Sequence, residues 1–176
     1  MFIGIDLGGT NIAVGLVDEN GKIVQQGSTP TLAPRSYKEI VKDMVGLSEE
    51  LVKKAGISMN NIEGVGIGSP GSIDYKNGAV AYANNLGFND AHIREEFQKY
   101  YNIPVVLEND ANAAAYGEYI VNGNGANVFV AVTLGTGVGG GIIINNEIFK
   151  GSNGAGGEIG HFTLVHNGVP CTCGKK

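Results

Sequence analysis

The sequence predicts an α/β fold built from two similar lobes. Apolar runs of strand length alternate with two stretches of helical periodicity, which is typical of a mixed α/β chain. The chain also repeats itself, because Phe129–Gly137 lines up with Phe2–Thr10 at a constant offset, and each copy is a strand that ends in a glycine turn. Such a repeat indicates two related structural units. We therefore expect one lobe over residues 1–120 and the start of a second over residues 121–176.

The composition excludes several classes of function. With 176 residues, of which 43% are hydrophobic, the chain has enough apolar material for the core of one medium domain or two small ones. Acidic and basic residues are interspersed at a formal net charge of -5, which argues against nucleic acid or a membrane surface as the main partner. No apolar run approaches the roughly 20 residues of a membrane span, and the N-terminus lacks the pattern of a signal peptide. We therefore expect a cytoplasmic protein.

The first strands are predicted to form an antiparallel meander. Phe2–Asp6 is a short apolar strand, and after a glycine turn the chain resumes as a second strand over Ile12–Val17. The turn signal Asp18–Gly21 leads into a third strand over Lys22–Gln26. Further along, Val65–Ile67 begins a buried strand that breaks at a Gly-Ser-Pro-Gly turn.

Two helices are predicted before residue 104. Ser36 and Glu39 form the pattern of a capping box, which starts a helix that Gly56 can end. A second helix is expected to start at Asn89 or Asp90 and to end before Pro104. The apolar faces are expected at Ile40, Met44, Leu47 and Leu51 in the first helix and at Ile93, Phe97 and Tyr100 in the second.

Asp110 stands where an apolar strand that starts at Val105 meets an alanine-rich helix. Its carboxylate faces the positive end of the helix dipole and projects from the carboxyl end of a strand, where open α/β sheets hold their ligands. A general base fits this position. Asp is also a preferred residue for capping a helix, so a purely structural role fits the same stretch.

Two glycine turns are candidate phosphate-binding loops. A loop that holds phosphate needs backbone N–H groups that point inward and no side chains that block the approach. The first loop comprises Asp6, which supplies a carboxylate near a metal, and Gly8, Gly9, Thr10 and Asn11; the second comprises Gly135, Thr136 and Gly137. A glycine pair between strands is also the ordinary sequence of a tight hairpin, and it is the repetition of the motif that favours phosphate.

Four motifs together resemble one known family. They are Asp6-Leu7-Gly8-Gly9-Thr10, Glu108-Asn109-Asp110, the run from Leu134 to Gly141, and Gly157–His161 followed by Cys171-Thr172-Cys173-Gly174. In this order they are similar to the motifs of the bacterial ROK family of sugar kinases and repressors, and most similar to those of its glucokinases. The resemblance spans Phe2 to the last residue. It implies the actin-like, or ribonuclease-H-like, ATPase fold and transfer of the γ-phosphate of ATP to a sugar hydroxyl, which is the 6-hydroxyl of glucose in glucokinases.

The resemblance also implies a role for each matching residue. Asp110 matches the catalytic base. The implied sugar contacts are Gly71, Asn84, Asn109, Asp110, Glu158 and His161. The two phosphate loops would hold ATP and Mg²⁺, with Asp6 orienting the metal through water. The resemblance further implies a homodimer for the full-length form.

A zinc site is a further implication. Cys171 and Cys173 are separated by one residue, which suits a shared metal better than a disulfide in a reducing compartment. His161 either hydrogen-bonds locally or binds Zn²⁺ through one ring nitrogen while the other touches the sugar. Zinc prefers four ligands, and family members continue past the position of Lys176 with a further cysteine, a glutamate that contacts the sugar and the rest of the second lobe. The chain thus resembles a truncated member, and we expect the 176 residues alone to lack kinase activity and to bind zinc weakly.

Two functions of different kinds fit these motifs. The first is an ATP-dependent kinase for glucose, with another sugar such as fructose or N-acetylmannosamine as the alternative substrate. The second is a sugar-binding regulator. Repressors of the family carry a helix-turn-helix before the first phosphate loop, whereas the first strand here begins at Phe2. The sequence therefore favours the enzyme.

Overall fold

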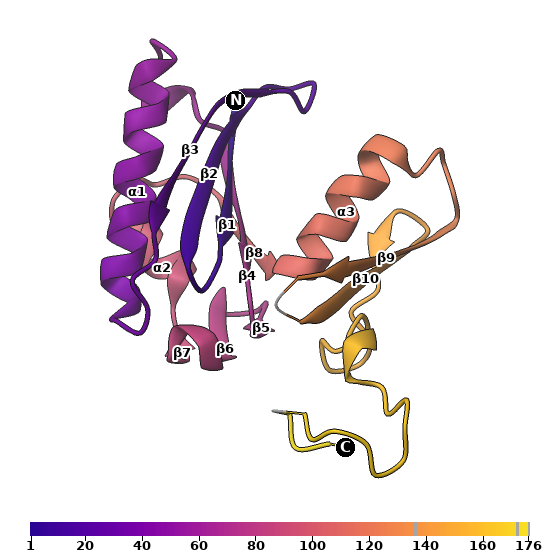
Figure 1. Cartoon of the computed structure of the whole chain (residues 1–176). Helices are drawn as coiled ribbons and strands as arrows, with labels where there is room; N and C mark the ends of the chain where they lie inside the picture. Colours follow the sequence, from indigo (N-terminus) through magenta and orange to yellow (C-terminus); the bar gives the residue numbers. More distant parts are fainter. Residues whose placement is uncertain (136, 172, 176) are drawn as a thin grey trace. The chain divides into compact units, whose positions relative to one another are not determined.

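The computed structural model describes residues 1–135, 137–171 and 173–175, and the chain divides into two units (Figure 1). Unit 1 is Met1–Asp110 and unit 2 is Ala111–Lys176. The predicted loop residue Thr136 lies outside the described residues. The lobe boundary expected between residues 120 and 121 stays a prediction.

A five-stranded sheet of order β3-β2-β1-β4-β8 is the centre of unit 1. Its strands are β1 (Phe2–Leu7), β2 (Asn11–Val17), β3 (Ile23–Pro30), β4 (Gly64–Ser69) and β8 (Val105–Asn109). The first three pair antiparallel, which confirms the predicted meander, and β4 and β8 continue the sheet parallel to β1. The third strand runs beyond its predicted end at Gln26, because Pro30 still pairs with Asn11 of β2.

Helices α1 (Tyr37–Lys54) and α2 (Ile93–Gln98) lie against this sheet (Figure 1). Helix α1 contacts β2, β3 and α2, and α2 contacts β8. The alternation along β1 sends Ile3, Ile5 and Leu7 into the core and leaves Asp6 exposed. The capping box of Ser36 and Glu39 is present at the start of α1, so this prediction is confirmed.

The predicted start of the second helix is wrong. Asn89 and Asp90 belong to strand β7 (Phe88–Ala91), and the helix begins only at Ile93. Asn89 pairs with Tyr82 of the neighbouring strand, and this pairing outweighs the preference of Asn for helix starts. Tyr100 lies beyond the end of α2 at Gln98 and is 44% exposed, so its predicted burial is also wrong.

A three-stranded sheet of order β5-β6-β7 was not predicted. It is formed by β5 (Ser72–Asp74), β6 (Ala79–Ala83) and β7, and it follows the turn that ends β4. Two 3₁₀ turns, Met59–Asn61 and Asn84–Leu86, complete the regular structure of unit 1. The sheet is relevant to function because Gly71 comes directly before β5 and Asn84 directly after β6.

Unit 2 is built from helix α3 and a second three-stranded sheet. Helix α3 (Asp110–Asn122) begins at the last residue of unit 1, and the sheet has the order β11-β10-β9. Its strands are β9 (Val128–Leu134), β10 (Val138–Ile144) and β11 (Glu147–Ile148), and a 3₁₀ turn follows at Ile159–His161. Strands β9 and β10 form an antiparallel hairpin around the second glycine turn, as the sequence repeat predicted.

Small residues let α3 lie close to β10. A methyl group added to Gly141 would lie 2.4 Å from the Cβ of Ala115, and one added to Gly139 would lie 3.1 Å from the Cβ of Ala111. Ala115 is fully buried in this contact. The glycine run of β10 therefore matches the alanine-rich face of the helix.

None of the helices among the described residues combines the length and the apolar character needed to cross a membrane.

Candidate functional site

The carboxyl ends of β1, β4 and β8 bring the polar motifs of unit 1 to one edge of the sheet. Asp6 pairs with Gly68, and Gly68 pairs with Glu108, so both carboxylate side chains lie on the same face with a glycine between them. Asn109 ends β8, and Asp110 follows it as the first residue of α3. The parallel strands thus collect residues that are about a hundred positions apart in the sequence.

Asp6 and Asp110 influence each other electrostatically. Although Asp6 as a whole is exposed, the atoms around its carboxyl partly desolvate it and raise its pKa, and the negative charge of Asp110 raises it further. Two carboxylates that share one sheet edge repel each other, and a divalent cation relieves this repulsion. The donor chemistry at this edge therefore fits Mg²⁺.

The first glycine loop is a tight turn held by β3 and the segment that follows it. The N–H of Gly8 donates to the carbonyl of Asn11 at 2.9 Å, and the Thr31 hydroxyl donates to the carbonyl of Gly8 at 2.7 Å. A methyl group added to Gly8 would lie 2.8 Å from the carbonyl oxygen of Asn11, so only glycine fits this turn. The geometry is that of a hairpin between β1 and β2, and the phosphate-binding role of this turn stays a prediction.

Unit 1 also brings Gly71 and Asn109 together. The side-chain amide of Asn109 donates to the carbonyl of Gly71 across 3.4 Å, a long hydrogen bond. Gly71 has a φ of 95°, and a methyl group there would lie 2.1 Å from the carbonyl oxygen of Tyr82. Asn84 accepts a similarly long hydrogen bond, 3.4 Å, from the Tyr82 hydroxyl. The two candidate sugar contacts Gly71 and Asn84 therefore flank the β5–β6 hairpin, one at each end.

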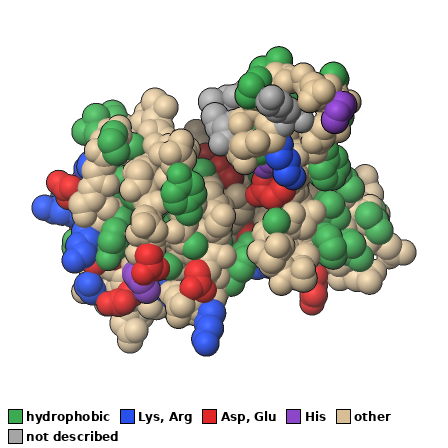
Figure 2. Space-filling view, turned by 90° about the horizontal axis from the view of Figure 1, so that it is seen from below, with side chains coloured by type: hydrophobic (Ala, Val, Ile, Leu, Met, Phe, Trp, Pro, Cys, Tyr) green, Lys and Arg blue, Asp and Glu red, His purple; other side chains and the backbone are tan. Residues whose placement is uncertain are grey.

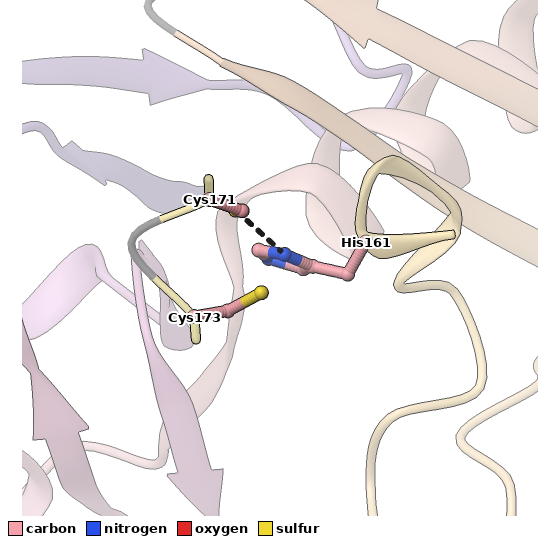
Figure 3. Close-up of side chains that lie close together, drawn as sticks. All are labelled: His161, Cys171 and Cys173. Atoms are coloured by element: carbon pink, nitrogen blue, oxygen red, sulfur yellow. Dashed lines mark hydrogen bonds between the residues drawn. The ribbon is translucent and has the colours of Figure 1, made fainter. Parts of the chain in front are cut away.

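In unit 2 the three predicted zinc ligands lie together. The side chains of His161, Cys171 and Cys173 point toward one another, and their ligand atoms all lie within 4.8 Å of each other (Figure 3). The Nδ1 atom of His161 is 3.8 Å from the Cys171 sulfur, and its Nε2 atom is 3.6 Å from a carboxylate oxygen of Glu158. One ring nitrogen thus faces Cys171 while the other faces Glu158, and the division of this histidine between zinc and sugar stays a prediction.

The thiol chemistry of this cluster fits a metal. Hydrogen bonds from the backbone and side chain of Cys173, and then from His161, lower the pKa of Cys171 to about 7. A thiolate is the form of cysteine that binds metal. Two sulfurs and one imidazole nitrogen are typical donors for zinc, and a tetrahedral site needs one donor more.

The second glycine loop joins β9 to β10. The N–H of Gly135 donates to the carbonyl of Gly137 at 3.0 Å, which closes the turn. Both glycines are exposed.

Charged side chains do not form a field of one sign on the face shown in Figure 2, where Asp and Glu lie among Lys and Arg. Such a face does not steer a polyanion over long distances.

Sequence reasoning missed one residue at the sheet edge. The Tyr75 hydroxyl donates to Glu108 at 2.6 Å, directly beside Asn109 and Asp110. Tyr75 and Glu108 are 33 positions apart, and no periodic signal in the sequence links them.

Comparison with known proteins decides the family. A model of the ROK family matches residues 2–176. The chain belongs to the ROK family. The glucokinase of Halalkalibacterium halodurans is 36% identical to it, over 99% of this chain and 53% of that protein. The xylose repressor of Bacillus subtilis is also 36% identical, over 99% of this chain and 45% of the repressor.

A solved structure of a ROK family protein is also similar to the chain in both fold and sequence. It is the ROK family glucokinase from Streptomyces griseus in complex with glucose and AMPPNP, with a TM-score of 0.85 and 39% identity over 99% of this chain and 54% of that one. The fold is accordingly the actin-like ATPase fold of the ROK sugar kinases, which confirms the fold that the motifs implied. The chain spans about half the length of the curated relatives it matches.

Proposed function

We propose that the protein that carries this chain is an ATP-dependent sugar kinase that transfers the γ-phosphate of ATP to the 6-hydroxyl of glucose. The observation that carries the proposal is the edge where Asn109 and Asp110 close β8 on the same sheet as Asp6. The identity of 36% to a glucokinase supports the choice of reaction. Phosphoryl transfer asks a protein mainly for positioning and electrostatic stabilisation, which a carboxylate and two glycine loops supply.

In this proposal Asp110 is the general base. Its carboxylate accepts the proton of the sugar hydroxyl as that oxygen attacks the γ-phosphorus. The sugar contacts are Gly71, Asn84, Asn109 and Asp110 from unit 1, and Glu158 and His161 from unit 2. Each supplies a polar group to a sugar hydroxyl, and sites of this kind discriminate strongly against analogues that lack the hydroxyl.

Mg²⁺ and the phosphates of ATP have their own residues in the proposal. Asp6 would orient the metal through water, and the metal would supply positive charge to the phosphates. The phosphate loops are Gly8, Gly9, Thr10 and Asn11 in unit 1 and Gly135, Thr136 and Gly137 in unit 2.

Zn²⁺ is proposed as a structural ion held by His161, Cys171 and Cys173. The support is the approach of the three ligand atoms to within 4.8 Å and the lowered pKa of Cys171. When bound there, zinc would fix which ring nitrogen of His161 carries the proton, and thereby the group that this histidine would offer to the sugar.

Asp110→Asn tests the proposed chemistry. The amide keeps the shape and one acceptor but cannot take a proton, so ADP release in a coupled assay should fall to background while glucose binding by calorimetry survives. Loss of glucose binding as large as the loss of turnover would instead identify Asp110 as a structural helix cap. A panel of sugars tests the substrate, and fructose or N-acetylmannosamine ranking above glucose would overturn the assignment of glucose.

A sugar-binding regulator is the second candidate, because a xylose repressor is as similar in identity as a glucokinase. A regulator would bind a sugar without releasing ADP in the same assays.

We further propose a cytoplasmic homodimer, with sugar and ATP as small-molecule partners and with neither nucleic acid nor membrane as a partner. Light scattering on the purified protein measures the dimer directly.

A further inference from the structure

The turn between β5 and β6 is unusually well held. Both carboxylate oxygens of Asp74 are engaged: one accepts from the Asn77 N–H at 3.1 Å and the other from the Asn77 side-chain amide at 2.7 Å. The N–H of Gly78 donates to the carbonyl of Asp74 at 2.8 Å, and Gly78 has a φ of 64°. These bonds fix the backbone of the turn in one conformation.

Arg94 of helix α2 also binds this turn through hydrogen bonds. The N–H of Arg94 donates to the carbonyl of Gly78 at 3.0 Å. The guanidinium of Arg94 donates to the carbonyls of Tyr75 at 3.2 Å and Lys76 at 3.4 Å. A methyl group on Gly78 would lie 2.3 Å from the Arg94 Nε, so the turn and the arginine are packed in direct contact. The backbone of the turn that contains Tyr75 is therefore held by hydrogen bonds within the turn and from Arg94.

The side chain of Tyr75 extends from this turn to Glu108, close in sequence to the proposed base Asp110. Its hydroxyl donates to Glu108 Oε1 at 2.6 Å, and the same oxygen accepts the backbone N–H of Asn109 at 2.9 Å. Hydrogen bonds to an ionised carboxylate are short and strong, and Glu108 is only partly exposed, so water competes weakly. Tyr75 thus holds the carboxylate that holds the peptide group between Glu108 and Asn109, directly before Asp110.

We propose that Tyr75 is a positioning residue that acts through Glu108 to set the orientation of Asn109 and Asp110 toward the sugar. The same hairpin carries Gly71, whose carbonyl accepts from the Asn109 side chain, so the hairpin contacts this segment at two points. The inference deepens the proposed function and rests on it for its effect on turnover. The mechanical part, in which Tyr75 and Glu108 fix the Asn109 backbone, stands on the geometry alone.

The central test compares Tyr75→Phe with Tyr101→Phe. The Tyr101 hydroxyl hydrogen-bonds to Glu49, so the control removes the same kind of Tyr–Glu bond in the same unit, but before the start of β8 rather than at its end. In the protein that carries this chain, Tyr75→Phe should lower kcat about tenfold and change KM for the sugar by less than about twofold, because a misdirected base affects the transition state more than binding. Tyr101→Phe should leave both values unchanged. Equal effects of the two substitutions on kcat would overturn the proposal.

Glu108 variants separate positioning from general support. Glu108→Gln keeps an oxygen that accepts from both donors and should retain most of kcat, whereas Glu108→Ala should lose about as much as Tyr75→Phe or more. If Tyr75 acts through Glu108, adding Tyr75→Phe to Glu108→Ala should cause no further loss. Fully multiplicative losses in the double variant would overturn the proposed relay.

Amide exchange tests the mechanical part without any turnover. In the 176-residue chain, hydrogen exchange at the Asn109 N–H should become about tenfold faster in Tyr75→Phe and should not change in Tyr101→Phe. Unchanged exchange at Asn109 would overturn the inference even for an active kinase. Faster exchange in a protein that phosphorylates no sugar would uphold the mechanical coupling and overturn the proposed function instead.

Discussion

Asp6 binds its proton more tightly in the folded chain than in an unfolded one, because burial and the charge of Asp110 both raise its pKa from the usual 3.8. A raised folded-state pKa contributes stability that is fully present below pH 3.8 and is lost as the pH rises through the folded-state pKa. Above that pH the ionised carboxylate is destabilising. Asp6→Asn should therefore stabilise unit 1 more at pH 7 than at pH 3.5, as measured by urea unfolding at each pH.

Asp110→Asn provides the control for this prediction. It removes the second cause of the raised pKa of Asp6, so it should reduce the difference between the two pH values. A gain from Asp6→Asn that is larger at pH 3.5 than at pH 7 would contradict the assignment.

Cys171 should react as a thiolate near neutral pH. Its pKa is lowered to about 7, first by hydrogen bonds from Cys173 and then by His161, and the thiolate is the nucleophile. Alkylation of Cys171 by iodoacetamide, located by peptide fragmentation, should reach half its maximal rate near pH 7, and Zn²⁺ should suppress it. Cys173→Ala, which removes the side-chain donor and keeps the backbone one, should move the midpoint upward. A midpoint at or above about 8.5, the value of an ordinary thiol, would contradict the geometry of the cluster.

At the scale of elements, the glycine run of β10 sets how closely α3 packs. Gly141→Ala places a methyl group 2.4 Å from the Cβ of Ala115, so the helix must move away from the strand. We expect a loss of about 1–3 kcal/mol in the stability of unit 2, measured by exchange of the α3 amides in increasing urea.

Gly117→Ala is the matched control for this change. Gly117 lies within α3 with no atom within 4 Å of an added methyl group. Alanine there should stabilise the helix by about 0.5–1 kcal/mol. The idea fails if both substitutions stabilise α3.

Elements with local signals were predictable from the sequence. The capping box of Ser36 and Glu39 and the glycine turns are contained in a few consecutive residues, and the structure has them where expected. The β5–β6–β7 sheet was missed because its strands are short and are held by pairing between strands, as between Tyr82 and Asn89. That pairing turned a polar stretch predicted to start a helix into a strand.

The candidate site likewise contains residues with local sequence signals and residues whose importance depends on distant contacts. Residues such as Asp110 and Cys171 could be proposed from the sequence because each of their motifs is continuous, and their roles stay predictions. Tyr75 could not be found in this way, because its importance comes only from a hydrogen bond to a residue 33 positions away. Contacts of this kind depend on sheet register, which the sequence does not display.

At the scale of the whole molecule, β9 presents an apolar face to solvent. Val128, Val130, Val132 and Leu134 alternate along the strand and are 59%, 53%, 54% and 81% exposed. Exposed apolar patches of this kind promote association. We expect the isolated 176-residue chain to self-associate at micromolar concentrations, as measured by sedimentation velocity.

Paired substitutions test the origin of this association. Val130→Thr together with Val132→Thr keeps β-branched side chains but makes the face polar, and should shift the chain toward monomer. Ile23→Thr changes a residue that is 54% exposed on β3 and should have no such effect. Association that is unchanged in the double variant would assign it to another surface.

The hydrogen bond from Tyr75 to Glu108 also limits how this chain can be recombined with its relatives. A designer who seeks a new sugar preference would transplant the β5–β6 hairpin, since it carries Gly71 and leads into Asn84. Such a graft replaces the donor of a bond whose acceptor remains behind on β8. The hairpin and the end of β8 should therefore be exchanged together, although they are separate segments of the sequence. Chimeras that keep both segments from the same protein should fold and function better than chimeras that combine segments from two proteins.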